Sequence, residues 1–325
     1  MKTILVTGGC GFIGSNFIRN LLEHRDYHIV NVDKLTYAGN AENLADLEND
    51  PRYFFAKADI ADVKNMEAIF QSHKPFGVIN FAAETHVDRS IKNSCPFIQT
   101  NILGTHVLLE LSRKFEVEKY HQVSTDEVYG DLGDRSTNFF TETTPLAPNC
   151  PYAAAKTSAD LLVQSWYETY GLHTIITRCS NNYGPYQFPE KLIPLFLFKA
   201  MNNEPLPLYG DGQNVRDWLY VLDHCEAILT AFERSAAGEV WNIGGYNEKT
   251  NQCIAELIVK ETGSHSIIEF VEDRKAHDRR YAIDAKKIAE KLGWEPQHTF
   301  ESALPKTIQW YLHHRDWVEH ARGKV

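Results

Sequence analysis

A hydroxyl group and two adjacent carboxyl groups occur together at Thr125, Asp126 and Glu127, in the run VSTDEVYG. They follow a strand-like run, KYHQVS. Because side chains along a strand alternate between its faces, all three groups converge only if the strand has already ended. Two carboxyl groups in a dry site push their pKa values apart, which leaves one acid and one base. Two alternatives remain: one carboxylate caps the next short helix, or both are solvated.

A phenol and an ammonium group lie four residues apart, at Tyr152 and Lys156, in a helical pattern that begins at Pro151. This spacing places both side chains on one face of a helix. A phenol is a poor base at neutral pH, but a neighbouring ammonium group and a cationic nicotinamide both favour the phenolate. The pair therefore predicts a general base for an alcohol, provided that a dinucleotide site lies beside it.

A glycine-rich loop supplies that site. Gly8, Gly11 and Gly14 follow the first strand-like run and open a helix, the context in which glycines let the backbone approach a pyrophosphate at a helix N-terminus. The next strand-like run ends in Asp33, where a carboxylate can bind ribose hydroxyl groups. Because Asp33 would repel a 2'-phosphate, NAD is the predicted cofactor rather than NADP.

The elements that must position these groups alternate along the chain. Short β-branched runs separated by helical patterns predict an α/β fold with a doubly wound parallel sheet of the Rossmann type. After about Asn181 the sequence becomes rich in Pro, Tyr, Asn and Gly. We therefore predict an NAD-binding domain over residues 1–180, to which segments near 215–245 return, and a smaller α/β substrate lobe over residues 181–325.

The composition limits the class of protein. The 325 residues carry a net charge of −10 and are 43% hydrophobic and 23% charged. These values favour a soluble protein and argue against a general affinity for nucleic acid or a membrane. Six scattered cysteines and the lack of a signal-peptide pattern predict a cytoplasmic location. His313, His314 and His320 have no carboxylates at ligand spacing, so no metal site is expected.

Five motifs in order make this chain similar to the extended short-chain dehydrogenase/reductase family: TGGCGFIG, FAAETHVDRS, VSTDEVYG, Tyr152-x-x-x-Lys156 and RCSNNYGP. The resemblance covers essentially the whole chain. It implies a NAD site formed by Gly8, Gly11, Phe12, Ile13, Gly14, Asp33, Lys34, Leu35, Thr36, Asp59, Ile60, Ala82, Ala83, Thr100, Tyr152, Lys156 and Asn182.

The Thr-Asp-Glu triplet is similar to that of the sugar-nucleotide 4,6-dehydratases within this family, and the resemblance implies a hydro-lyase that acts on dTDP-glucose. In this reading Tyr152 and Thr125 assist oxidation at carbon 4 of the hexose. The ketone acidifies carbon 5, so that Glu127 removes its proton while Asp126 protonates the hydroxyl group that leaves carbon 6. A 4,6-dehydratase, epimerase or decarboxylase that acts on a UDP-sugar, and a non-catalytic NAD-binding regulator, are the alternatives.

The resemblance also implies the substrate contacts. They are Glu84, Thr85, His86, Thr125, Asn181, Lys191, Leu192, Pro207, Leu208, Tyr209, Arg216, Asn251, Arg274 and His277. Arg216, Arg274 and His277 are the expected diphosphate clamps, although loop arginines are more often solvated. A homodimer is implied, through helices at about Cys95 to Phe115 and Tyr152 to Tyr170; core packing explains the latter pattern equally well. The segment from Asp131 to Thr141 is shorter than in many relatives, so its conformation is not predicted.

Overall fold

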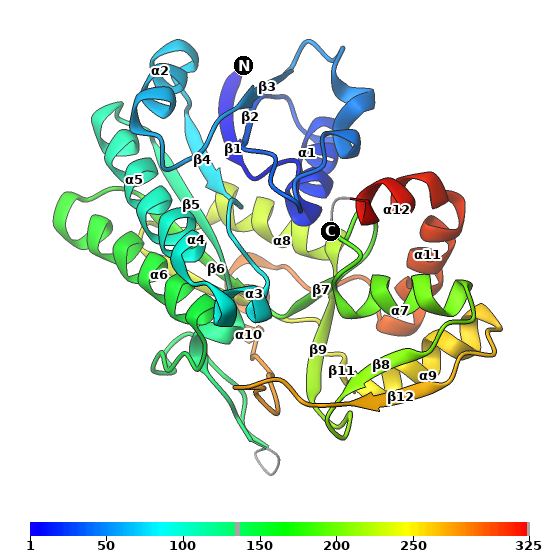
Figure 1. The fold of residues 1–325 in the computed structure, drawn as a ribbon. Helices are drawn as coiled ribbons and strands as arrows, with labels where there is room; N and C mark the ends of the chain where they lie inside the picture. Colours follow the sequence, from blue (N-terminus) through cyan, green and yellow to red (C-terminus); the bar gives the residue numbers. More distant parts are fainter. Residues whose placement is uncertain (134–136, 324–325) are drawn as a thin grey trace.

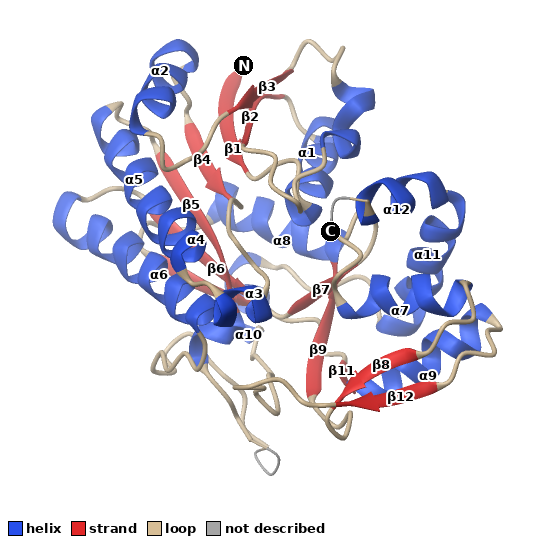
Figure 2. Ribbon diagram, viewed as in Figure 1, coloured by secondary structure: helices blue, strands red, loops and turns tan. Residues whose placement is uncertain are grey.

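A parallel sheet of seven strands forms the centre of the larger part of the molecule (Figures 1 and 2). The computed structural model describes residues 1–133 and 137–323. In spatial order the strands are β10 (Glu239–Ile243), β6 (Thr174–Cys179), β5 (Lys119–Thr125), β4 (Gly77–Asn80), β1 (Lys2–Thr7), β2 (Tyr27–Asp33) and β3 (Tyr53–Lys57). All six pairings are parallel. The predicted Rossmann-type α/β fold is confirmed.

Both faces of this sheet are covered because its strands are apolar on both sides. Within β1, Ile4 and Val6 pack toward α1 (Phe12–His24) and α8 (Val221–Arg234). Leu5, between them, packs on the opposite face. There the covering helices are α2 (Val63–His73), α5 (Thr105–Lys114) and α6 (Pro151–Tyr170). The core of this part therefore consists of two layers, one on each face of the sheet.

Segments from the second half of the chain return to the large sheet. The edge strand β10 pairs with β6, α8 packs on α1, and α10 (Lys286–Leu292) packs on β10. By contrast, β9 (Val215–Tyr220) pairs with β7 (Asn181–Tyr183) and β11 (Glu248–Thr250) in a separate sheet of three strands. The second half of the chain thus contributes strands both to the large sheet and to the smaller lobe.

The smaller lobe surrounds a core of its own (Figure 1). It holds the three-stranded sheet and a parallel pair, β8 (Leu206–Tyr209) and β12 (Ile268–Val271). Its helices are α7 (Leu192–Met201), α9 (Asn251–Thr262), α11 (Phe300–His313) and α12 (Arg315–Arg322). The domain boundaries predicted from the sequence stay a prediction.

Short helical segments connect the larger elements and carry several of the predicted site residues. They are the 3₁₀ helices η1 (Ala41–Leu47) and η3 (Asp126–Tyr129), the π-helical segment η2 (Ile98–Gly104), and α3 (Val87–Lys92) and α4 (Cys95–Phe97). Of the segment 131–141, residues 134–136 lie outside the described residues. No helix within the described ranges is long and apolar enough to span a membrane.

Candidate active site

The glycine loop between β1 and α1 forms the floor of a pocket between the two lobes. Gly8 has a φ of +69°, and a Cβ atom there would lie 2.6 Å from the backbone nitrogen of Ala82. A Cβ atom on Gly14 would lie 2.4 Å from the carbonyl oxygen of Gly8. The N-cap of α1 is Gly11, which provides no side-chain cap. The loop, which we call the cradle, thus leads without a side-chain cap into the N-terminus of α1, the kind of helix end that suits a pyrophosphate.

The carboxylate of Asp33 closes one end of this cradle. It accepts hydrogen bonds from the backbone nitrogens of Cys10 at 3.0 Å and Leu35 at 2.8 Å. Burial nonetheless raises its pKa, because desolvation outweighs these two bonds. Beside it, the Lys34 ammonium group donates to the Thr100 hydroxyl at 2.7 Å. A carboxylate and a neighbouring ammonium group thus line the same pocket.

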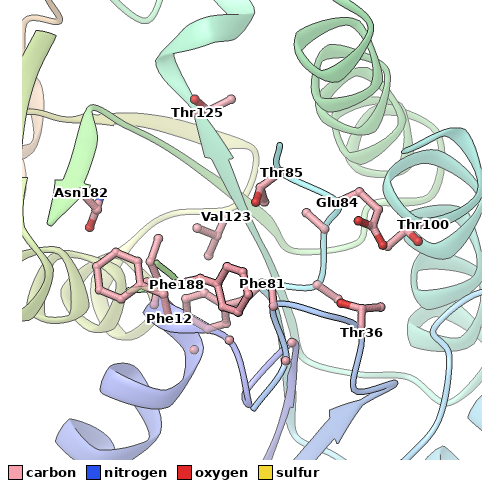
Figure 3. Close-up of a pocket in the computed structure, with 18 of the residues that line it drawn as sticks. Phe12, Thr36, Phe81, Glu84, Thr85, Thr100, Val123, Thr125, Asn182 and Phe188 are labelled. Carbon is pink, nitrogen blue, oxygen red and sulfur yellow. The ribbon is translucent and has the colours of Figure 1, made fainter. Parts of the chain in front are cut away.

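Most of the predicted cofactor residues line this pocket, and Figure 3 shows Phe12, Thr36 and Thr100 around it. Leu35 and Asp59 are not among its lining residues within the described chain. The predicted cofactor residues that line it are Gly8, Gly11, Phe12, Ile13, Gly14, Asp33, Lys34, Thr36, Ile60, Ala82, Ala83, Thr100, Tyr152, Lys156 and Asn182.

The predicted base residues enter the pocket from the first turns of α6. Tyr152 and Lys156 are both buried, and the Lys156 ammonium group donates to the carbonyl oxygen of Val123 at 2.6 Å. The pKa of the Tyr152 phenol is raised well above its ordinary value, chiefly by burial and then by the negative charge of Glu127. A hydrogen bond to Thr125 opposes this rise. Forming the phenolate therefore depends on cations close to the hydroxyl group.

The acid pair lies where the sheet ends. Strand β5 stops at Thr125 and η3 begins at Asp126, so the strand ends at the triplet, as convergence of the three groups requires. Thr125 caps η3 by accepting from the backbone nitrogen of Glu127 at 3.3 Å, and its hydroxyl donates to Asp126 at 3.3 Å. The cap is thus made by the hydroxyl group and by neither carboxylate. Asp126 is only 2% exposed, which excludes the solvated alternative for it.

The two carboxyl groups are held in different environments. Burial raises the pKa of Asp126 well above its ordinary value, and the charges of Glu127 and Asp217 raise it further. Burial also raises the pKa of Glu127, but the charges of Arg274, Arg216 and Lys191 oppose the shift. Asp126 is consequently the better proton donor and Glu127 the better proton acceptor.

The predicted substrate residues are divided between several places. Glu84, Thr85, Thr125, Asn181 and Lys191 line the pocket, and Figure 3 shows Glu84, Thr85 and Thr125 at its wall. Tyr209 and Arg274 line a second pocket together with Asp88 and Lys92. His86, Leu192, Pro207, Leu208, Arg216, Asn251 and His277 are not among the described lining residues of either pocket.

Arg216 is buried and its guanidinium group is engaged with protein. It donates to the carbonyl oxygens of Val215 at 2.8 Å and Asp278 at 2.8 Å, and it lies 4.5 Å from the centre of the Tyr281 ring. The alternative of a solvated loop arginine is therefore wrong for this residue. Its charge still acts on both carboxyl groups of the acid pair.

Sequence reasoning missed Glu190, whose buried side chain lines the pocket. Its Oε2 atom lies 3.4 Å from Arg89 Nη2 and 3.5 Å from His86 Nε2, and the Arg89 guanidinium group stacks 3.6 Å from the centre of the Tyr37 ring. We call Tyr37, His86, Arg89 and Glu190 the Glu190 cluster. The available signal was an adjacent acid and lysine in the otherwise apolar run FPEKLIPLF. Cys179, Gln187 and Phe188 also line the pocket without having been predicted.

A Rossmann-type sheet with a dinucleotide cradle, a Tyr-Lys helix and an acid pair defines a nucleotide-dependent α/β enzyme. The family model described as GDP-mannose 4,6 dehydratase matches residues 5–307, so this chain belongs to that family. It is similar to the dTDP-glucose 4,6-dehydratase of Shigella flexneri, with 51% identity over 98% of this chain and 95% of the relative.

Two solved structures share the whole fold. The dTDP-glucose 4,6-dehydratase of Bacillus anthracis, in complex with NAD, is 49% identical, with a TM-score of 0.92 over 99% of this chain and 100% of that one. DesIV of Streptomyces venezuelae, a dTDP-glucose 4,6-dehydratase with NAD and TYD bound, is 44% identical, with a TM-score of 0.95 over 98% of this chain and 99% of that one. The predicted membership in the extended short-chain dehydrogenase/reductase family is confirmed.

Proposed function

We propose that this chain is a dTDP-glucose 4,6-dehydratase that uses tightly bound NAD. The observation that carries the proposal is the acid pair, buried Asp126 and half-buried Glu127, directly after the hydroxyl of Thr125 and close to Tyr152. An enzyme that only oxidises or epimerises an alcohol needs the hydroxyl and the phenol, but elimination of water needs an additional acid and base. The relatives named above support the same activity.

The residues present fit NAD. Gly8 and Gly14 allow the close backbone packing that shapes the loop at the N-terminus of α1, where a pyrophosphate would bind, and Asp33 lines the same pocket at the expected ribose end. When bound, NAD stores the hydride removed from carbon 4 and returns it to carbon 6, so that it is not consumed. Asp33 disfavours a 2'-phosphate by charge repulsion.

The roles of the site residues follow from their positions. Tyr152 accepts the proton of the sugar hydroxyl, with Thr125 as hydrogen-bond partner and Lys156 as the nearby cation. Glu127 removes the proton at carbon 5, which the neighbouring ketone makes acidic. Asp126, kept protonated by burial, donates its proton to the departing hydroxyl group, and water leaves. Carbon 5 takes up a proton again as the hydride returns to carbon 6. The product is dTDP-4-keto-6-deoxy-glucose, an intermediate of deoxysugar biosynthesis and, by our proposal, of rhamnose biosynthesis.

One assay separates this function from its alternatives. The NAD-loaded chain is incubated separately with dTDP-glucose, UDP-glucose and a UDP-sugar acid; mass spectrometry gives the mass of each product and NMR its stereochemistry. We expect dTDP-glucose to lose one water. Loss of water from UDP-glucose alone would indicate a UDP-sugar dehydratase, altered stereochemistry at constant mass an epimerase, and loss of carbon dioxide from a UDP-sugar acid a decarboxylase. A regulator would return every sugar unchanged.

The acid assignment has its own test. Asp126→Asn keeps the shape of the side chain but removes the proton donor. We expect this variant to oxidise the sugar and then stall, so that the absorbance of reduced cofactor builds up on the enzyme. Dehydration at the wild-type rate would show that Asp126 is not the acid.

We also propose that the active form is a cytoplasmic homodimer. Helices α5 and α6 pack side by side, and apolar side chains on or next to them face solvent: Ile98 at 53%, Leu103 at 40% and Leu161 at 53% exposure. A pair of such surfaces buries them by isologous contact. Leu161→Glu should yield monomers in analytical ultracentrifugation, whereas Phe270→Glu, on exposed β12, should remain dimeric. A wild-type monomer would contradict the proposal.

A further inference from the structure

A buried ion pair lies behind the active site. Arg178, on β6, donates from Nε to the Asp160 carboxylate at 2.9 Å, and the two side chains are 2% and 0% exposed. Such a pair offers little net stability over apolar packing, because burial costs both charges their hydration. Stability by itself therefore does not account for the pair, and the contacts at its two ends indicate a further role.

One end reaches the acid pair. Arg178 Nη1 donates to the hydroxyl oxygen of Tyr129 at 3.0 Å, and Tyr129 is the last residue of η3, which begins with Asp126. The Tyr129 hydroxyl in turn donates to Asn242 Oδ1 on β10 at 2.7 Å. We call Asp160, Arg178, Tyr129 and Asn242 the Arg178 network. Through it, the turn that carries both carboxyl groups is tied to two strands of the large sheet.

The other end reaches the base. Asp160 lies on α6, one helical turn after Lys156 and two turns after Tyr152, so it shares their face of the helix. Burial lowers the pKa of the Lys156 ammonium group, and the charge of Asp160 is the largest opposing influence. The network thus spans the elements that carry the base and the acid pair.

We infer that Arg178 and Tyr129 are positioning residues that fix η3, which carries Asp126 and Glu127, relative to α6, which carries Tyr152. This inference rests on the proposed function. Neither side chain lines the pocket within the described chain. Their effect reaches the substrate through η3. The Thr125 cap and a hydrogen bond from the Ala147 nitrogen to the Val128 carbonyl at 3.0 Å also hold η3, as does apolar packing of Val128 and Tyr129.

The two chemical steps depend on this network to different degrees. Oxidation uses Tyr152, Lys156 and Thr125, which lie on α6 and at the end of β5. Elimination also needs Asp126 and Glu127 to be correctly placed against the sugar, and both residues lie on η3. Loosening η3 while Arg178 keeps its bond to Asp160 therefore slows elimination more than oxidation.

The substitution Tyr129→Phe should loosen η3 while leaving the bond between Arg178 and Asp160 in place. It deletes one hydroxyl group and keeps the ring that stacks on Phe140 at a centroid distance of 5.1 Å. In single turnovers with dTDP-glucose, we expect elimination to slow by about tenfold, which corresponds to a barrier increase of about 1.4 kcal/mol. Formation of reduced cofactor should change by less than about twofold, so reduced cofactor accumulates. Stopped-flow absorbance follows oxidation, and mass spectrometry of quenched samples follows loss of water.

Two further variants separate positioning from stability. Tyr120→Phe removes a buried hydroxyl that donates to Gln122 at 2.9 Å, at the far end of β5; it should lower the melting temperature comparably and leave the ratio of the two steps unchanged. Arg178→Lys keeps a charge beside Asp160 but lacks the fork that reaches Tyr129 as well. It should reproduce the effect of Tyr129→Phe on the step ratio.

The outcomes decide between the two proposals. If Tyr129→Phe slows both steps equally, or changes neither while the wild-type chain dehydrates dTDP-glucose, the positioning inference is overturned and the proposed function stands. If the wild-type chain leaves dTDP-glucose unchanged, the proposed function fails and this inference fails with it.

Discussion

The Nζ atom of Lys156 lies 2.6 Å from the backbone carbonyl oxygen of Val123, to which it donates a hydrogen bond. This contact joins α6 to β5 just two residues before Thr125. Lys156 is buried, and a buried ammonium group is retained only where such partners compensate for its lost hydration. The lysine thus holds a positive charge one helical turn from Tyr152.

Lys156→Met should therefore impair the oxidation step. The substitution keeps much of the side-chain volume but removes the charge that favours the phenolate, and we expect the formation of reduced cofactor to slow by roughly 10²–10⁴-fold, the usual range for lost acid–base assistance. Stopped-flow absorbance measures this step. Tyr152→Phe should show a defect in the same step, whereas normal oxidation in Lys156→Met would contradict the role of the ammonium group.

The buried carboxyl group of Asp126 should cost stability at neutral pH. Its pKa is raised in the folded chain, so the folded state binds the proton more tightly than the unfolded state, in which the pKa is about 3.9. The carboxyl group therefore destabilises the fold increasingly as pH rises above about 4, until the raised pKa is passed. The amide of Asp126→Asn cannot ionise, so this destabilisation of the fold is absent from the variant.

We accordingly expect Asp126→Asn to melt above the wild type near pH 8, by roughly 2 °C for each kcal/mol gained, and the difference to shrink as pH falls toward 4. Melting curves across this pH range, with saturating NAD, measure the effect. Glu23→Gln, which alters an exposed carboxylate on α1, should show no such pH dependence. A less stable Asp126→Asn at pH 8 would refute the direction assigned to the pKa.

Gly8→Ala should abolish NAD binding. The introduced Cβ atom would meet the Ala82 nitrogen at 2.6 Å and fill the cradle, while Gly263→Ala introduces a Cβ at a similar φ of +63° with nothing within 4 Å. We expect Gly263→Ala to cost about 1 kcal/mol of backbone strain and to keep its NAD. Gly8→Ala should cost a further 1–3 kcal/mol, roughly, from overpacking. Bound nucleotide and denaturation midpoints distinguish the two; equal NAD contents would contradict the assignment of the cradle.

Arg89→Ala should accelerate the loss of NAD. In the Glu190 cluster, Arg89 connects the Tyr37 loop to Glu190, and both neighbours adjoin the pocket. Loss of a stacked cation costs about 0.5–1 kcal/mol at an exposed site, so the dissociation rate should rise about two- to fivefold. Gel filtration followed by measurement of retained NAD tests this. Arg322→Ala, which removes a comparable stack 3.5 Å from the Phe198 ring centre, should retain NAD normally.

Much of the site could be predicted because its residues are close together in the sequence. The glycine spacing, Asp33 at the end of the second strand, and the helical interval between Tyr152 and Lys156 are each set within a few residues by local geometry. Thr125, Asp126 and Glu127 are likewise consecutive, so the end of one strand places all three together. For these groups the strand and helix patterns, together with the rule that ligands bind at the carboxyl edge of a parallel sheet, were sufficient.

The rest depended on long-range packing. Glu190 meets Arg89 across more than a hundred residues of chain, and Arg178 meets Tyr129 across 49; no local spacing indicates either contact. From the sequence, Arg216 could be either a diphosphate clamp or a solvated loop arginine. The fold buries its guanidinium group against carbonyl oxygens. The chain by itself thus determined which chemical groups are available and at which sheet edge they gather. Only the tertiary structure decided their ionisation and orientation, because burial and distant charges set both.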